Sequence, residues 1–193
     1  MRKIVFLLTA AMVMTAASFA QDAKSIGFGL KAGANFANLK YDIDGDDESG
    51  DMKVGINAGA FVNLPIGTNF AIQPELVYSA EGSKDDETDE KLNLNYLNIP
   101  VMFQYTASGF YAETGPQIGF LMSAEADDED VKDLFESTNF SWAIGLGYKL
   151  PAGIGFGARY NLGLSNLIKD GTDDFKLKSN VIQVGLSYTF GGK

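Results

Sequence analysis

The sequence predicts an all-β protein: an eight-stranded antiparallel up-and-down transmembrane β-barrel preceded by a cleaved signal peptide. Three observations predict it: an N-terminal export signal, segments in which apolar residues alternate with small or polar ones, and connections that alternate between short turns and long acidic stretches. Alternation with a period of two is typical of a strand whose two faces have different surroundings. The 193 residues suit one domain of this kind.

The beginning of the chain has the features of a secretory signal peptide. Two basic residues precede a short apolar run, and small residues then fit cleavage between Ala20 and Gln21. The apolar run is shorter than the roughly 20 residues that a membrane-spanning helix needs, and an uncleaved anchor is the alternative interpretation. We therefore expect residues 1–20 to be the signal peptide and residues 21–193 to be the outer-membrane β-barrel domain.

The composition excludes several functions. The chain contains no Cys and no His, so it can build neither Cys/His zinc sites nor the Ser-His or Cys-His pairs of many hydrolases. No other activated nucleophile is evident, and we expect no enzyme activity, no metal and no cofactor. The net charge is −10, and it becomes more negative by two when Arg2 and Lys3 leave with the signal peptide. This charge opposes binding to nucleic acid.

Acidic residues divide the remaining chain into segments. Of the 25 acidic residues, 22 lie in four clusters, at residues 42–51, 81–90, 125–136 and 170–174. The segments around the clusters alternate as strands do and are rich in Gly, Thr, Tyr, Phe and Val. We expect strands at residues 26–38, 52–64, 70–81, 92–105, 110–123, 138–150, 154–166 and 177–190.

The connections between these strands are of two kinds. The acidic clusters lie in the connections between the first and second, third and fourth, fifth and sixth, and seventh and eighth strands. The other three connections are short, Gly-containing turns: "PIGTN", "TASG" and "PAG". In an up-and-down barrel every second connection lies at the same end, so the acidic stretches share one rim. Short periplasmic turns and longer external loops are typical of outer-membrane barrels. We therefore expect an outer-membrane protein with periplasmic termini and turns and with extracellular acidic loops.

The two faces of the strands differ as lipid and lumen would require. In the strand at 154–166, one face carries large apolar side chains such as Phe156 and Leu162, and the other carries Gly, Ser and Asn with Arg159. Small polar residues suit the narrow interior of an eight-stranded barrel. Aromatic residues gather where the apolar faces approach the short turns, which is typical of a lipid interface.

The strand at 92–105 is the least regular one. Its apolar phase slips between Tyr96 and Leu97. Pro74, Pro100 and Pro116 also lie inside expected strands, where proline removes a donor from the ladder. A bulge near residues 96–97 would account for both observations.

Four segments resemble a known family. "GLKAGANFANL" (29–39), "IQPELVYSAEG" (72–82), "YLNIPVMFQY" (96–105) and "GPQIGFLMS" (115–123) are similar to the PorT-like outer-membrane β-barrel proteins. The resemblance covers the whole expected mature chain and implies fold and location rather than a particular activity.

The end of the chain resembles the signal that the barrel-assembly machinery reads during insertion, which implies this machinery as a partner. The residues that carry this resemblance are Gln183, Gly185, Tyr188 and Phe190. The chain departs from the usual form because three residues follow the final aromatic one. An ordinary alternating strand is the alternative interpretation.

Four charged residues fall on the predicted polar faces at similar depth: Lys31, Glu75, Glu113 and Arg159. Two cations and two anions would neutralise one another inside the lumen, where an unpaired charge is costly. A structural plug, a gate on a narrow ion path and a pair of hydrolase carboxylates are the three interpretations. Large residues also fall on the inward face, which favours the plug; these are Phe61, Met102, Tyr111 and Leu121.

The first acidic cluster has the beginning of a calcium loop. Asp42, Asp44 and Asp46 match the first three ligand positions, but Asp47 and Lys53 occupy the positions that need Gly and Glu. This is not an EF-hand. Weak cation binding, including divalent ions that bridge the loops to lipopolysaccharide, and a solvated, mutually repelling rim remain open.

Two functions follow from this pattern. The first is a small integral outer-membrane barrel with a largely occluded lumen, whose acidic external loops give it a structural or surface-interaction role toward lipid, lipopolysaccharide or an extracellular partner. The alternative is a narrow ion or small-solute pore gated by the lumen charges. The strand number disfavours a general porin, because an aqueous channel takes about 16 strands.

Overall fold

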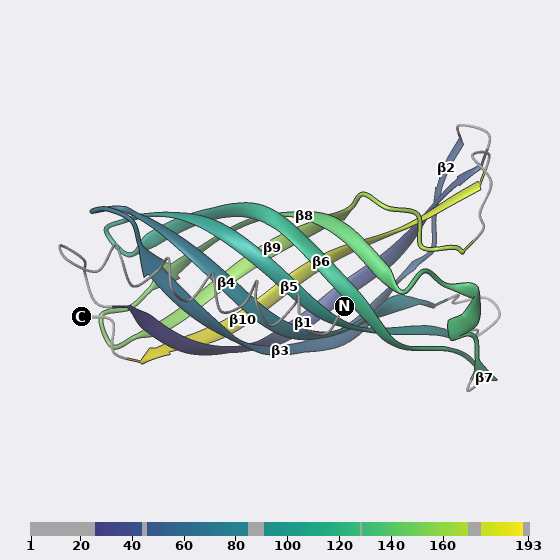
Figure 1. Ribbon diagram of the computed structural model, residues 1–193, viewed down its shortest axis with the longest axis horizontal. Coiled ribbons are helices and arrows are strands. Elements are labelled where there is room, and N and C mark those ends of the chain that lie inside the picture. Colours follow the sequence, from purple (N-terminus) through teal and green to yellow (C-terminus); the bar gives the residue numbers. More distant parts are fainter. Residues whose placement is uncertain (1–25, 44–45, 85–90, 128, 170–174, 191–193) are drawn as a thin grey trace, which may run out of the picture.

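Long antiparallel strands wind around a closed barrel in the computed structural model, which describes residues 26–43, 46–84, 91–127, 129–169 and 175–190 (Figure 1). The barrel strands are β1 (Gly27–Ile43), β3 (Asp51–Pro65), β4 (Phe70–Lys84), β5 (Lys91–Ala107), β6 (Phe110–Ala126), β8 (Thr138–Lys149), β9 (Ile154–Gly163) and β10 (Phe175–Phe190). Three short elements accompany them: β2 (Asp46–Ser49), β7 (Glu129–Asp130) and the 3-10 helix η1 (Lys132–Leu134).

Each barrel strand pairs with its neighbours in chain order, and β10 pairs with β1 to close the cylinder. This seam runs from Phe28 opposite Phe190 to Ile43 opposite Phe175. The predicted eight-stranded up-and-down barrel is therefore confirmed. Each barrel strand lies where the alternation places it, but several ends differ. Strand β1 continues to Ile43 rather than ending near residue 38, β4 and β6 each continue three residues further than predicted, and β9 ends at Gly163 rather than near residue 166. The predicted signal peptide and its cleavage site at Ala20 and Gln21 lie outside the described residues.

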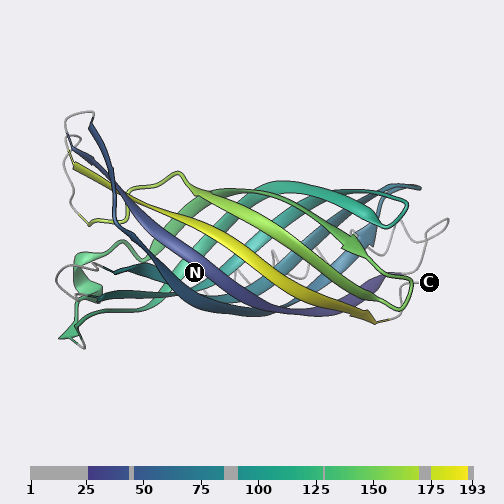
Figure 2. The same cartoon turned by 180° about the vertical axis from the view of Figure 1, so that it is seen from behind.

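The three tight connections close hairpins at one end of the barrel, which we call the turn end. Between β5 and β6, Ser108 and Gly109 both have positive φ angles, of 51° and 88°. Two left-handed residues are what a two-residue hairpin needs to match the twist of its strands. The opposite end, which carries β2, β7 and η1, is the loop end (Figures 1 and 2).

The predicted bulge exists, but it belongs to the neighbouring strand. Asn95 pairs with Ser123 whereas Tyr96 pairs with Leu121, so Met122 of β6 is the extra residue. Strand β5 keeps its alternation, because Tyr96 points inward and is fully buried. Apolar residues occur on both faces of β5 here, because the interior of the barrel is also apolar at this level.

The prolines do not coincide with the bulge. The β4–β5 register is the same at Pro74 and at Val77, and the β5–β6 register is the same at Pro100 and at Phe103. The idea that one bulge accounts for both the phase slip and the prolines is therefore wrong. The wall accepts these prolines without a change of register.

The outer wall is apolar. Large hydrophobic side chains are about half exposed or more on every barrel strand, including Val54, Ile144 and Leu186. Aromatic rings contact one another near the turn end, with centroids 4.7 Å apart for Phe110 and Tyr148. No helix among the described residues is both long and apolar enough to cross a membrane.

Trp142 and Thr114 are polar side chains of the outer wall whose hydrogen bonds are made within the wall. The indole N–H of Trp142 donates to Thr114 Oγ1 at 2.9 Å, and the Thr114 hydroxyl donates to the Ala143 carbonyl at 3.0 Å. In lipid such groups have no water to bond, so internal partners are required. This surface is suited to hydrocarbon.

Candidate functional site in the barrel lumen

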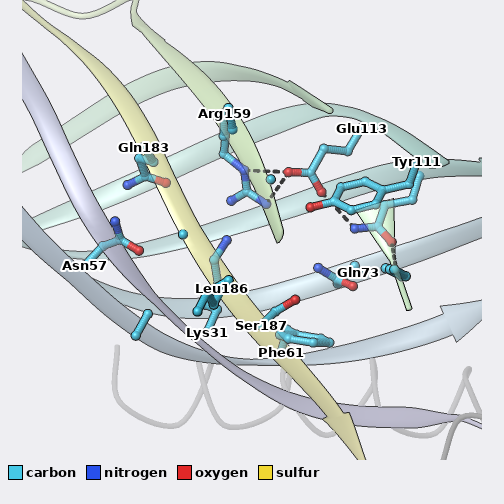
Figure 3. A pocket seen from close by; sticks show the side chains of 16 residues that line it. Lys31, Asn57, Phe61, Gln73, Tyr111, Glu113, Arg159, Gln183, Leu186 and Ser187 are labelled. Atoms are coloured by element: carbon cyan, nitrogen blue, oxygen red, sulfur yellow. Dashed lines mark hydrogen bonds and ion pairs between the residues drawn. The ribbon is translucent and has the colours of Figure 1, made fainter. Parts of the chain in front are cut away.

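The structure brings the four predicted lumen charges together. The Arg159 guanidinium on β9 donates through Nη1 and Nη2 to the two carboxylate oxygens of Glu75, at 2.8 and 2.7 Å, and through Nε to Glu113 Oε1 at 2.8 Å. Lys31 Nζ lies 3.0 Å from Glu75 Oε2. We call these four residues the ion-pair network (Figure 3 shows Arg159 facing Glu113).

The register of the barrel explains why these side chains meet. A continuous row of paired residues crosses the wall from Gln183 through Arg159 and Gly145 to Glu113 and Gln104. Gly145 separates Arg159 from Glu113 in this row. A Cβ atom there would lie 2.9 Å from Glu113 Oε1, so the missing side chain leaves room for the carboxylate to reach the guanidinium.

Amide side chains hold the carboxylates from the other side. Gln73 Nε2 donates to Glu75 Oε1 at 2.9 Å, and Gln104 Nε2 donates to Glu113 Oε2 at 2.8 Å. Lys149 Nζ donates in turn to Gln104 Oε1 at 2.9 Å. Lys149 and Gln104 were not among the predicted cluster residues. Their inward phase on β8 and β5 was the available signal, since Lys149 alternates with Gly145 and Gly147.

A cavity of about 50 Å³ lies beside the ion-pair network. Among its lining residues are Lys31, Tyr111, Glu113, Lys149, Arg159 and Gln183 (Figure 3). A cavity of this size holds a few water-sized occupants. Gly147 and Gly157 allow Tyr111 to extend into it, because a Cβ at either position would collide with the phenol oxygen.

Toward the loop end, the interior becomes apolar. Buried side chains from four barrel strands and from the segment after β9 form one cluster, which we call the apolar cluster: Leu39, Leu94, Tyr96, Leu121, Ala124, Leu167 and Leu177. Phe135 and Ile168, which form an isolated bridge, pack against it from the loop side. Leu121 lies on the inward face, as predicted from the sequence, and the other members of the cluster make the interior apolar rather than small and polar at this level.

The environment of Glu81 also differs from what the sequence suggests. The sequence places it at the start of an acidic cluster and at the end of the expected strand 70–81, yet β4 continues to Lys84 and only 4% of the Glu81 surface is exposed. It accepts hydrogen bonds from Ser179 Oγ at 2.9 Å and from Asn98 Nδ2 at 3.2 Å. Within the described part of the chain, no cation lies within ion-pair distance of its carboxylate.

Several buried polar side-chain atoms of the lumen have no hydrogen-bond partner among the described residues. They are Ser141 Oγ, both amide atoms of Asn161, Gln183 Nε2 and Tyr96 Oη. Buried polar groups are normally satisfied, and internal water is the usual partner when protein is not. The lumen around Ser141, Asn161 and Gln183 is therefore hydrophilic.

Of the other predicted residues, Gln183 and Gly185 line the lumen cavity. Tyr188 and Phe190 face outward near the turn end, with ring centroids 4.8 Å apart. Asp44 lies outside the described residues, and only the backbones of Asp42 and Asp46 are described, in β1 and β2. In the part of the chain that the structure describes, no group of three or more acidic side chains is placed to hold a metal ion.

Comparison with solved structures finds barrels of the same fold. Ail, the attachment invasion locus protein of Yersinia pestis in complex with sucrose octasulfate, is 15% identical, with a TM-score of 0.50 over 86% of this chain and 99% of that one. Neisserial surface protein A is 13% identical, with a TM-score of 0.51 over 84% of this chain and 97% of that one. At these identities the likeness shows the fold alone. No match was found among curated proteins.

The family is shown by a sequence model. The model of the outer membrane protein β-barrel domain matches residues 19–169, which is well over half of the chain. The closed barrel, its apolar outer wall and its structural neighbours agree with this match. The chain therefore belongs to the outer membrane protein β-barrel domain family and is a small transmembrane barrel of the outer membrane.

Proposed function

We propose that this barrel is a surface-interaction protein of the outer membrane that presents an open strand edge outside the cell. One observation carries the proposal. At the loop end, past the last β1–β3 pair at Ala37, residues 38–43 of β1 pair with residues 175–180 of β10 on one side, and residues 40–43 pair with β2 on the other. We call this three-stranded extension the protruding sheet (Figures 1 and 2).

The outer edge of the protruding sheet suits an extended partner. Strand β2 is the last strand in the pairing order and has no second neighbour among the described residues. A strand with unpaired backbone groups can accept another strand. Its sequence includes Asp46, Asp47 and Glu48, so the partner that fits best is an extended, cationic segment.

The charge of this edge disfavours a polyanion. The solved Ail complex contains sucrose octasulfate, a heparin analogue. The present chain carries a net charge of −10 and three acidic residues on β2, which would repel such a ligand. A shared barrel therefore does not imply a shared ligand.

A lumen that is closed in two layers supports a role at the surface rather than in transport. The ion-pair network fills the interior near the middle of the barrel, and the apolar cluster fills it toward the loop end. A hydrophobic constriction excludes water, and a fully paired charge network holds its side chains in place. We infer that the lumen is largely occluded.

The test uses the full-length barrel in lipid vesicles and a fluorescent decapeptide of alternating Lys and Thr. We expect salt-sensitive binding that falls at least about tenfold when Asp46, Asp47 and Glu48 are changed to Asn, Asn and Gln, a loss of about 1.4 kcal/mol. A matched peptide with Pro at alternate positions keeps its charge but cannot add to a sheet edge. Equal binding of the two peptides, or no effect of the triple change, would refute the proposal.

A narrow ion pore is the second candidate. The unpartnered polar atoms of Ser141, Asn161 and Gln183 favour it, because a hydrated middle section is what a conducting lumen needs. Planar-bilayer recording of the refolded protein separates the candidates: steady unitary currents support the pore, and their absence supports occlusion.

The proposal also includes several assignments made from the sequence. They comprise the PorT-like affinity, the cleaved signal peptide, the extracellular side for the acidic loops, a contact with the barrel-assembly machinery through the last strand, and the absence of enzyme activity. Weak cation binding by the loop around Asp42, Asp44 and Asp46 is tested by calorimetric titration with Ca²⁺, where no heat at millimolar concentration would exclude it.

A further inference from the structure

The cavity beside the ion-pair network has an excess of positive charge. Three cations line it, Lys31, Lys149 and Arg159, and the acidic residue on its lining is Glu113. Counting Glu75, which pairs with Arg159 and Lys31 from the other side, still leaves three cations for two carboxylates. The excess is notable in a chain whose net charge is −10. An uncompensated charge inside a barrel is costly.

The carboxylates present cannot neutralise the third cation. Glu113 Oε1 accepts from Arg159, and Oε2 accepts from Gln104. Both oxygens of Glu75 are engaged by Arg159, with Lys31 and Gln73 as additional donors. Lys149 Nζ donates instead to Gln104 Oε1, an uncharged acceptor.

Unused donors converge on the same cavity. Gln183 Nε2 has no hydrogen-bond partner among the described residues, although only 6% of Gln183 is exposed and its side chain lines the cavity. An ammonium group carries three N–H donors. Lys31 and Lys149 each show one side-chain acceptor in the described structure, so both retain donors for a further ligand.

We propose that this cavity binds one small monovalent anion, either chloride or a carboxylate of one or two carbons. The ligand accepts hydrogen bonds from Lys149, Lys31 and the Gln183 amide and supplies the missing negative charge. About 50 Å³ admits such an ion but not a sugar acid. The ion enters from the turn end, where Lys31 and Lys149 are only partly buried. This site is independent of the proposed surface interaction, because the strand edge lies at the loop end.

The experiment measures thermal unfolding of the refolded barrel in a zwitterionic detergent. Potassium chloride, formate and gluconate are compared at equal ionic strength, gluconate being too large for the cavity. We expect the unfolding midpoint of the wild type to rise with chloride and formate concentration and to saturate, as it does when a ligand binds only the folded state. Gluconate should give no such rise.

Two variants and a control assign the effect to the cavity. Lys149→Gln removes the excess charge, and Gln183→Glu supplies a fixed negative charge in place of the ligand, so both should lose the anion dependence. Lys91→Gln, at an exposed position at the start of β5, should retain it. Equal midpoints in chloride and gluconate for the wild type would overturn the proposal. So would an unchanged anion response in Lys149→Gln, whether or not Gln183→Glu folds.

Discussion

Arg159 joins both carboxylates of the ion-pair network, and its planar guanidinium is the reason that one residue can do so. It approaches Glu75 through two nitrogens and Glu113 through Nε and Nη2, with all distances between 2.7 and 2.8 Å. A lysine presents a point charge rather than a fixed fork of donors. The network therefore depends on the shape of this side chain as well as on its charge.

Replacing Arg159 with Ala should destabilise the barrel strongly. The change leaves Glu75 and Glu113 buried with Lys31 as the remaining cation of the network, and breaking a buried pair in this way costs about 3–5 kcal/mol. Urea unfolding of the vesicle-inserted protein measures the loss, and Arg159→Lys should recover only part of it. A variant as stable as the wild type would show that the network does not hold the barrel together.

Glu75 and Glu81 form a matched test of buried carboxylates on one strand. Glu75 has two cationic partners, whereas Glu81 has neutral donors from Ser179 and Asn98. We expect Glu75→Gln to lower the free energy of unfolding by a few kcal/mol, because it leaves cations unpaired. Glu81→Gln should be neutral or stabilising, because it removes an unpaired buried charge. Equal losses in urea unfolding of the two variants would contradict this distinction.

The alternation of inward and outward positions along the strands was sufficient to select Lys31, Glu75, Glu113 and Arg159 from the sequence. It was insufficient for Glu81. The acidic residues that follow Glu81 suggested that a loop begins there, whereas β4 continues to Lys84. Lys149 had the right phase, yet nothing in the sequence shows that a neutral amide, Gln104, would be its acceptor. Such pairings depend on the stagger of the strands, which the sequence does not specify.

At the scale of elements, alternation and turn chemistry located all the barrel strands, but not the irregularities between them. The bulge at Met122 was expected near residues 96–97 of β5 because the apolar phase slips there, between Tyr96 and Leu97. Leu94 and Tyr96 point inward and belong to the apolar cluster, an environment about as hydrophobic as lipid. Periodicity alone cannot distinguish two apolar surroundings, so the strand that carries the extra residue could not be assigned.

The last strand allows assembly in cells to be separated from stability. If Phe190 belongs to an insertion signal, Phe190→Ala should reduce the amount of barrel in the outer membrane by several-fold. Refolding of the purified protein into vesicles should change little, because the ring is about half exposed on the outer wall. Leu186→Ala, also outward on β10, is the matched control and should assemble normally. Equal behaviour of the two variants in cells would exclude a special role for Phe190.

At the scale of the whole molecule, the closed barrel was predictable because two independent patterns agree. The alternation of side chains defines the two faces, and the alternation of long and short connections defines the two ends. The protruding sheet was not predictable, since β2 is polar and acidic and reads as a loop. It is a strand because β1 continues past the barrel wall and offers it a partner.

The two internal layers act in series, which leads to a prediction for the complete barrel. An ion that crosses the lumen must pass both the ion-pair network and the apolar cluster, so removing one layer leaves the other in place. We expect no steady current in planar bilayers from the wild type, from Arg159→Ala, or from the pair Tyr96→Ser and Leu121→Ser. Tyr96 and Leu121 are both buried in the apolar cluster, and polar replacements there would let water enter.

Combining all three substitutions should produce small unitary currents, provided that vesicle-inserted protein retains its strand content by circular dichroism. A steady current from the wild type would establish the pore in place of the occluded barrel. A current from Arg159→Ala alone would show that the apolar cluster does not close the lumen and that the charged layer alone controls passage.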